Sequence, residues 1–232
     1  MGSGEVKSFG SDLELLHEML CSEKNFSFSK YADGEYAVLR GIPITNCDGW
    51  RFDPDDHKEN RKLLVESFRY SGEGYIAGIS CPCCQPKDHV QWMRDNCKAD
   101  YVTWANLLVN SNYESFKSLF FPEFKKRKVT LVANENGAGK EMPFECDYIP
   151  VSGHFWLQDI SGFVKDMKSK AKNSRDEVYL FSCGPLGNIL AHQMHQENRE
   201  NVYMDIGSTV NPWVVGNNRG YLRGRNKKTC IW

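Results

Sequence analysis

The sequence lacks a long apolar run and a strong excess of charge of either sign. None of its apolar stretches approaches the ~20 residues that a bilayer-spanning helix requires, so we expect no membrane span. The formal net charge is -1, which excludes the bulk positive field that holds a nucleic-acid backbone. Basic residues gather at 125–128 and 219–228. We interpret both groups as solvated surface, although the second could help neutralise a phosphorylated ligand.

Two common enzyme motifs are also missing. A P-loop needs four residues between its first glycine and Gly-Lys-Ser/Thr. Here Gly137 precedes Gly139 by two positions, and Glu141 stands where the hydroxyl residue belongs. No G-x-S-x-G nucleophile elbow is present. Kinase, NTPase and serine-hydrolase activities are therefore not expected.

The nine cysteines form no small-domain disulfide framework, and their number is odd. This favours a reducing compartment, and we expect a cytoplasmic protein with free thiols. Residues 1–10, MGSGEVKSFG, lack the layout of a secretory signal. We interpret them as a flexible N-terminus or a tag remnant.

A cluster at Cys81, Cys83 and Cys84 suggests a metal site. A zinc module, however, usually has a pair of ligands and a second, distant pair, and this cluster supplies one crowded group with His89 and Cys97 nearby in sequence. Redox chemistry through Cys81 and Cys84 would place an unusual Pro-Cys insert between the two thiols. We therefore discount both possibilities and interpret the cluster as a loop after a strand.

Strand and helix patterns alternate along most of the chain, which predicts an α/β fold with a mostly parallel sheet flanked by helices, a Rossmann-like architecture. We expect a single domain, residues 1–232. The expected strands are 26–31, 75–80, 101–103, 129–133, 146–152, 177–183 and 201–207. The expected helices are 11–21, opened by a capping box at Ser11 and Glu14, then 35–40, one starting in 53–61, 86–97, 112–121, 155–172 and 184–198.

Ligands of such a sheet bind beyond the carboxyl ends of its strands. The first loop there contains Asp33, Gly34 and Glu35. The glycine lets both carboxylates turn toward one point, and paired carboxylates suit Mg²⁺ or Mn²⁺. Asp-Gly is also a common turn pair, so an ordinary turn is the competing interpretation.

Two further loops offer anion and hydroxyl binding. In Gly184-Pro185-Leu186-Gly187-Asn188, the proline suits the first helical position and the glycines allow close approach to a helix N-terminus that can seat a phosphate. The stretch is not a full dinucleotide fingerprint, and helix initiation alone would explain it. Asp205 ends the last strand, where it could bind a sugar hydroxyl, act as a general base or cap a turn.

Taken together, SFSKYADGE near the start and LFSCGPLGNILAHQM with VYMDIGS near the end resemble the two signature regions of the GT-D glycosyltransferases, a family once catalogued only as a domain of unknown function. The resemblance spans the whole domain in order and is sharp in these two places. It implies a Rossmann-like fold of the GT-D type and a metal-dependent glycosyltransferase, either a hexosyl- or a pentosyltransferase. Such an enzyme moves a sugar from a nucleoside-diphosphate donor, with a UDP-sugar favoured, to a hydroxyl of a glycan or glycoprotein acceptor.

By the same resemblance, Asp33 and Glu35 hold Mn²⁺ or Mg²⁺ and, with Asp205, form the catalytic set. The donor would contact a wider set: Lys30, Gly34, Gly184, Pro185, Gly187 and Asn188. The chain departs from the family pattern at Lys30, Tyr31 and Ala32, where Arg, Phe and Gly are usual, so Lys30 keeps the charge without the bidentate fork. Ser208 likewise follows Asp-Ile-Gly where His is common.

The residues themselves leave alternatives open. Asp205, Glu135 and His154 are rival general bases, and Trp104 and Trp156 either stack on the ligand or pack in the core. The competing functions are a non-catalytic nucleotide- or glycan-binding module and another Rossmann-type enzyme that uses NAD or SAM.

Overall fold

The computed structural model describes residues 8–46, 50–217, 219–225 and 230. Seven strands form one sheet in the order β5-β4-β1-β9-β8-β6-β7, and each neighbouring pair is parallel. The strands are β1 (Ser27–Lys30), β4 (Tyr75–Ile79), β5 (Tyr101–Trp104), β6 (Val129–Asn134), β7 (Asp147–Val151), β8 (Val178–Ser182) and β9 (Val202–Asp205). The predicted α/β fold with a parallel sheet is therefore confirmed.

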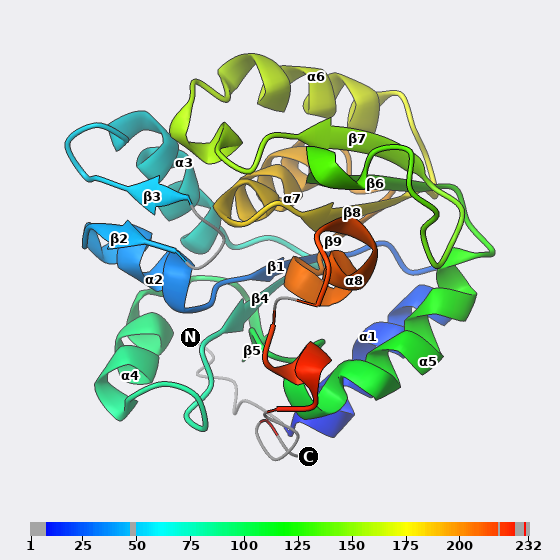
Figure 1. The fold of residues 1–232 in the computed structure, drawn as a ribbon, viewed down its shortest axis with the longest axis horizontal. Helices are drawn as coiled ribbons and strands as arrows, with labels where there is room; N and C mark the ends of the chain where they lie inside the picture. The colour runs from blue at the N-terminus through cyan, green and yellow to red at the C-terminus, as the bar shows by residue number, and fades with distance from the viewer. Residues whose placement is uncertain (1–7, 47–49, 218, 226–229, 231–232) are drawn as a thin grey trace.

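Helices cover both faces of this sheet (Figure 1). They are α1 (Phe9–Cys21), α2 (Asp33–Arg40), α3 (Lys58–Phe68), α4 (Lys87–Asn96), α5 (Tyr113–Phe124), α6 (Ser161–Lys172), α7 (Pro185–Glu197) and the short α8 (Asn211–Val214). Right-handed crossovers put α3, α4, α6 and α7 on one face, where α7 packs against β1, β9, α3 and α6. On the other face α1 lies beside α5. No helix among the described residues is long and apolar enough to cross a bilayer.

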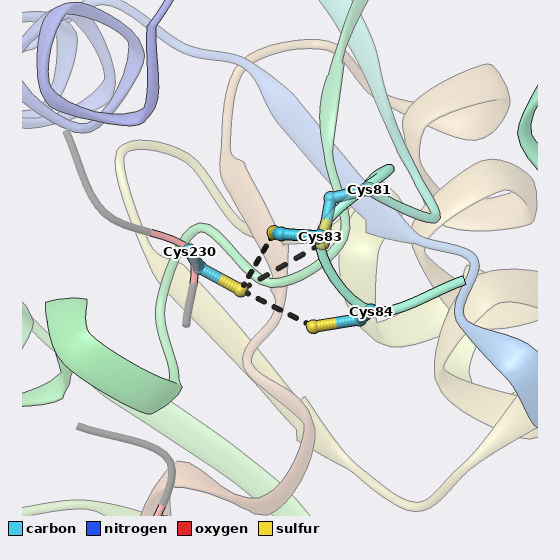
Figure 2. A group of neighbouring side chains, drawn as sticks. All are labelled: Cys81, Cys83, Cys84 and Cys230. Atoms are coloured by element: carbon cyan, nitrogen blue, oxygen red, sulfur yellow. Dashed lines mark hydrogen bonds between the residues drawn. The ribbon is translucent and has the colours of Figure 1, made fainter. Parts of the chain in front are cut away.

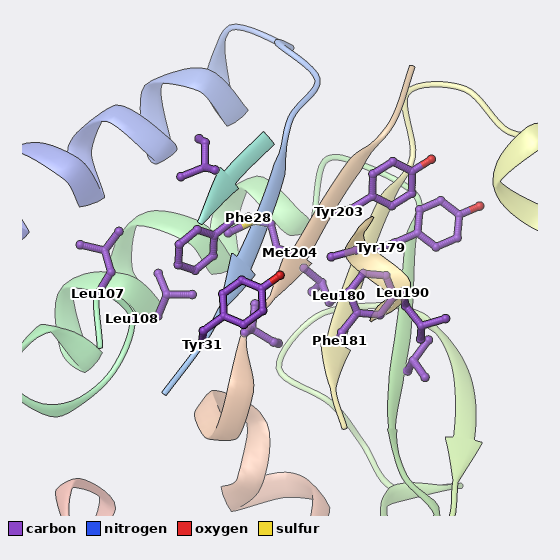
Figure 3. Packing of buried hydrophobic residues seen from close by; sticks show 14 of the residues in the cluster. Phe28, Tyr31, Leu107, Leu108, Tyr179, Leu180, Phe181, Leu190, Tyr203 and Met204 are labelled. Carbon is purple, nitrogen blue, oxygen red and sulfur yellow. The ribbon is translucent and has the colours of Figure 1, made fainter. Parts of the chain in front are cut away.

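The central strands carry the core (Figure 3). Phe28 of β1, Leu180 of β8 and Met204 of β9 are fully buried. Burying an apolar side chain of this size contributes about 1.5–3 kcal/mol. Because the three strands are neighbours within this core, their carboxyl ends are held in fixed relative positions.

The strand order reverses at the centre of the sheet. From β1 the chain proceeds to β4 and β5 on one side, then crosses to β6 and β7 and returns through β8 to β9, which lies between β8 and β1. The strand expected to close the series is thus a central one. A reversal of this kind opens a crevice at the carboxyl edge, where α/β proteins bind ligands.

Two predicted helix starts are wrong. Helix α1 begins at Phe9, with Ser8 as its N-cap accepting from the Ser11 amide, so Ser11 does not open a capping box. Residues 9 and 10 are therefore helical; residues 1–7 of the expected flexible N-terminus lie outside the described residues. Helix α6 begins at Ser161, whose amide donates to Asp159 Oδ1, and residues 155–157 form a separate 3₁₀ turn. Helix α3 begins at Lys58, within the expected 53–61 region, so this predicted helix start is confirmed.

One element has no counterpart in the predictions. Strands β2 (Ile44–Thr45) and β3 (Arg51–Phe52) pair as an antiparallel hairpin outside the main sheet. The Asn46 amide donates to the Trp50 carbonyl at 2.7 Å and closes the hairpin. This hairpin brings Trp50 over the carboxyl edge of the sheet.

Candidate functional site

The Asp33-Gly34 pair opens helix α2, so the competing interpretation as an ordinary turn is wrong. Glu35 is the third residue of this helix, and its Oε2 accepts a hydrogen bond from the Ala32 amide at 2.9 Å. A carboxylate in this position satisfies an amide that the helix leaves unpaired. Packing favours glycine at position 34, since a Cβ there would lie 3.0 Å from Asn46 Nδ2 and 3.2 Å from the Trp50 ring, closer than Cβ atoms usually approach. Asp33 remains exposed at the helix start.

The second loop opens helix α7. Gly184 has φ +59° and ψ -144°, a conformation that favours glycine, and Pro185 is the first helical residue. A Cβ on Gly184 would lie 3.4 Å from Trp50 Nε1. Trp50 therefore packs against the starts of both α2 and α7, and the two N-termini approach the same region.

Gly187 allows α7 to pack closely on the sheet. A Cβ at this position would lie 3.1 Å from the Cβ of Phe181 and 3.4 Å from the Cγ of Asp205. The close approach of helix and strand thus favours glycine at this position for a structural reason.

A cavity of about 620 Å³ lies at the carboxyl edge of the sheet. Its size is typical of small-molecule sites. Its charged lining residues are Lys30, Asp33, Glu35 and Arg219. Its neutral polar lining includes six asparagines: Asn46, Asn106, Asn110, Asn134, Asn136 and Asn211.

Lys30 lies close to two buried carboxyl groups. Burial raises the pKa of Asp205 to about 7; the charge of Lys30 opposes this and the charge of Glu35 adds to it. Burial likewise raises the pKa of Glu35, again against the charge of Lys30. The Gly207 amide donates to Asp205 Oδ1 at 2.9 Å. One lysine thus compensates two acids beneath and beside the cavity.

The structure divides the predicted site residues into two groups. Lys30, Asp33, Gly34, Glu35 and Gly184 line the cavity. The others are buried below it: Pro185, Gly187, Asn188 and Asp205.

Asn188 is one of the buried group and is fully shielded from solvent. Its Nδ2 donates to the Lys30 carbonyl at 2.7 Å and to Ser29 Oγ at 3.1 Å. It thereby positions the end of β1, next to the residues that line the cavity.

The structure also distinguishes the other candidate general bases and the two tryptophans. Glu135 and His154 are exposed and lie outside the cavity lining. Trp104 stacks on Phe9, with ring centroids 5.6 Å apart, and belongs to the core. Trp156 is buried but lines the cavity.

The sequence analysis missed the asparagines and Trp50. Asn134 ends β6 and Asn106 follows β5. Their positions after strands were the same signal that pointed to Asp33. Trp50 gave no such signal, because it reaches the site through the unpredicted hairpin.

No protein-family model matches this sequence, and a search of curated proteins finds no match. Two solved structures are similar, and both are of the same domain. One is described as "the highly conserved domain of unknown function 1792", which "has a distinct glycosyltransferase fold"; the other is its selenomethionine-substituted form. Each aligns over 90% of this chain and 80% of its own, with a TM-score of 0.62 and 12% identity. This chain has the same glycosyltransferase fold. The fold that the two sequence motifs implied is therefore confirmed.

Within this glycosyltransferase fold, the two motif regions meet although they are far apart in sequence. The first supplies β1 and the start of α2, and the second supplies β8, α7 and β9. Strand β9 pairs with both β1 and β8. The joint occurrence of the motifs therefore corresponds to one continuous site.

Proposed function

We propose that this chain is a glycosyltransferase that moves a sugar from a nucleoside-diphosphate donor, with UDP favoured, to a hydroxyl of a glycan or glycoprotein acceptor. One observation carries the proposal. The N-termini of α2 and α7, together with Lys30, face the same cavity beside Asp33 and Glu35. The glycosyltransferase fold agrees with it.

The leaving diphosphate accounts for this arrangement. Breaking the bond between sugar and diphosphate builds negative charge on the phosphate oxygens. Helix N-termini offer unpaired amides and a positive dipole end to such groups, and Lys30 adds a full charge. Donors fixed before the reaction stabilise this developing charge without reorganising.

The residues present also fit a divalent cation. Asp33 is exposed toward the cavity, and Glu35 Oε2 is engaged by the Ala32 amide. Among the described residues, no group of three or more metal-binding side chains includes this pair. That limited set suits Mg²⁺ or Mn²⁺, which are commonly bound by one or two carboxylates plus substrate phosphates. We propose that Asp33 and Glu35 hold the ion, which would neutralise charge on the leaving diphosphate.

The carboxylates that line the cavity are the ones able to meet an acceptor hydroxyl. Of the three acids predicted to be catalytic, Asp33 and Glu35 meet this requirement, whereas Asp205 is 2% exposed and binds the Gly207 amide. We therefore assign Asp205 to positioning the loop after β9 and to holding Lys30. Proton transfer from the acceptor then falls to an oxygen of Asp33 or Glu35 that does not bind the ion.

Ligand binding and donor hydrolysis test the proposal together. Thermal shifts are measured with UDP, GDP, NAD and SAM, each with and without Mn²⁺, and donor hydrolysis is followed on a panel of nucleotide sugars. We expect Mn²⁺-dependent stabilisation by one nucleoside diphosphate and slow hydrolysis of its sugar conjugate. Asp33→Asn should remove the metal dependence, whereas Asp166→Asn, on the exposed face of α6, should not.

The outcomes distinguish the competing functions. Stabilisation by NAD or SAM alone would identify another Rossmann-type enzyme. Nucleotide binding without hydrolysis or transfer, and unaffected by Asp33→Asn, would identify a binding module and contradict the proposal.

A further inference from the structure

The three cysteines interpreted as a loop have a fourth partner that the sequence did not reveal. Cys230, separated from Cys81 by 149 positions, lies against the turn that carries Cys81, Cys83 and Cys84. Figure 2 shows the four sulfurs directed toward one another. His89 and Cys97, the ligands considered from sequence proximity, are not part of this group.

The sulfur positions fit a single tetrahedral ion. The Cys230 sulfur lies 3.7, 3.6 and 3.5 Å from the sulfurs of Cys81, Cys83 and Cys84. The sulfurs of Cys81 and Cys83 are 3.1 Å apart, and all four lie within 4.8 Å of one another. Zinc–sulfur bonds of about 2.3 Å in a tetrahedron place sulfurs about 3.8 Å apart. An iron–sulfur cluster divides its four cysteines among two or four irons, which separates some of the sulfurs further than a single ion does.

The backbone directs the sulfurs to this point. After β4, the amides of Cys84 and Gln85 both donate to the Cys81 carbonyl, at 3.1 and 3.0 Å. This tight turn brings the three nearby thiols to one side. The Ser111 hydroxyl donates to the Cys230 carbonyl at 2.8 Å and fixes the fourth from the other end of the chain.

Side-chain amides surround the sulfurs with hydrogen-bond donors. Asn110 Nδ2 donates to Cys230 Sγ at 3.2 Å and lies 3.9 Å from Cys84 Sγ. Asn106 Nδ2 donates to Cys81 Sγ at 3.5 Å. Donors in this position stabilise the negative charge of metal-bound thiolates.

We infer that Cys81, Cys83, Cys84 and Cys230 bind one Zn²⁺ ion. Four protein ligands close the coordination shell, so the ion is structural rather than catalytic. The ion therefore joins Cys230, near the C-terminal end of the chain, to the loop after β4. Arg219 and Tyr221, which precede Cys230 in the chain, line the cavity, so the ion stabilises one wall of the site.

The metal content of the full chain tests this assignment. Protein is prepared in zinc-supplemented medium, without chelators and under reducing conditions, and its metals are measured by mass spectrometry. We expect about one zinc ion per chain, and near-complete loss of zinc in Cys230→Ser and in Cys83→Ser. Cys146→Ser removes a cysteine outside the group and should keep the zinc.

A second group of potential ligands, which includes His17 and Cys21, requires its own control. His17→Ala should also keep the zinc. Should Cys230→Ser fail to fold, Co²⁺ substitution of the wild-type protein decides, because four thiolates give intense sulfur-to-cobalt charge-transfer bands and tetrahedral d–d bands. Zinc retained by Cys230→Ser, zinc lost only in His17→Ala, iron in place of zinc, or a disulfide among the four cysteines would overturn the inference.

Discussion

Replacing Asp205 with asparagine removes an ionisable group from beneath the cavity while keeping the Oδ1 that accepts from Gly207. Burial raises the pKa of Asp205 from 3.8 to about 7, so the folded protein binds this proton more tightly than the unfolded chain does. The contribution of Asp205 to the free energy of unfolding is therefore largest below pH 4 and is lost as the pH rises toward 7. The difference between the two pKa values corresponds to roughly 4 kcal/mol, of which roughly 2.5 kcal/mol falls between pH 5 and pH 8.

Urea unfolding of both proteins from pH 5 to pH 8, without added divalent metal, measures this effect. Asp205→Asn carries no such penalty, so its free energy of unfolding relative to wild type should increase by roughly 2.5 kcal/mol across this range. The charge of Lys30 acts on Asp205 at every pH from 5 to 8, so it does not by itself make the difference in free energy of unfolding change with pH. A difference between variant and wild type that stays constant with pH would refute the assignment of a buried, proton-binding carboxyl at this position.

Two substitutions test the structural residues around the site. Gly184→Ala places a Cβ at φ +59° and should destabilise the protein by about 1–3 kcal/mol in urea unfolding; an unchanged midpoint would contradict the strained backbone. Asn188→Ala leaves the Lys30 carbonyl and the Ser29 hydroxyl without their donor and should cost about 1–3 kcal/mol. If it also weakens UDP binding more than an equally destabilising core variant such as Val164→Ala does, Asn188 positions Lys30 as proposed.

Local pattern was sufficient for the elements that are buried along most of their length. β4 and β8 read as short apolar runs, and α7 has Gly-Pro at its start, so each was predicted within about two residues, the usual uncertainty at element ends. The start of α6 was missed because residues 155–157 continue the apolar pattern, while the first helical amide, that of Ser161, donates to the Asp159 side chain. At this helix start, the apolar periodicity therefore extended beyond the true first residue of the helix.

Contacts between distant segments could not be predicted from one sequence. The placement of β9 between β1 and β8 depends on pairing across the chain, and so does the meeting of Cys230 with the turn after β4. The sequence analysis rejected a metal site because a second group of ligands was missing. The structure supplies that ligand through tertiary contact, which neither spacing nor composition encodes.

The distribution of polar groups along the cavity matches the linear order of a sugar nucleotide. Three of the four charged residues that line the cavity, Lys30, Asp33 and Glu35, lie at or just after the end of β1, near the middle of the sheet edge. Asparagines lie on both sides, Asn106 after β5 and Asn134 at the end of β6. A nucleoside diphosphate sugar likewise has a charged centre between two neutral, hydrogen-bonding ends. The charged groups should therefore contact the diphosphate, and the amides its two ends.

Affinities for a series of ligand fragments test this correspondence. UMP, UDP and a UDP-sugar are titrated by calorimetry against wild type and Lys30→Met in the presence of Mn²⁺. Lys30→Met should reduce the gain in affinity from UMP to UDP about tenfold or more, as expected for a charge-assisted contact of about 1.5–3 kcal/mol. The gain from UDP to UDP-sugar should persist, because neutral amides provide it. An equal loss at every step would mean that Lys30 supports the cavity as a whole, and the order of ligand groups along the sheet edge would then have no support.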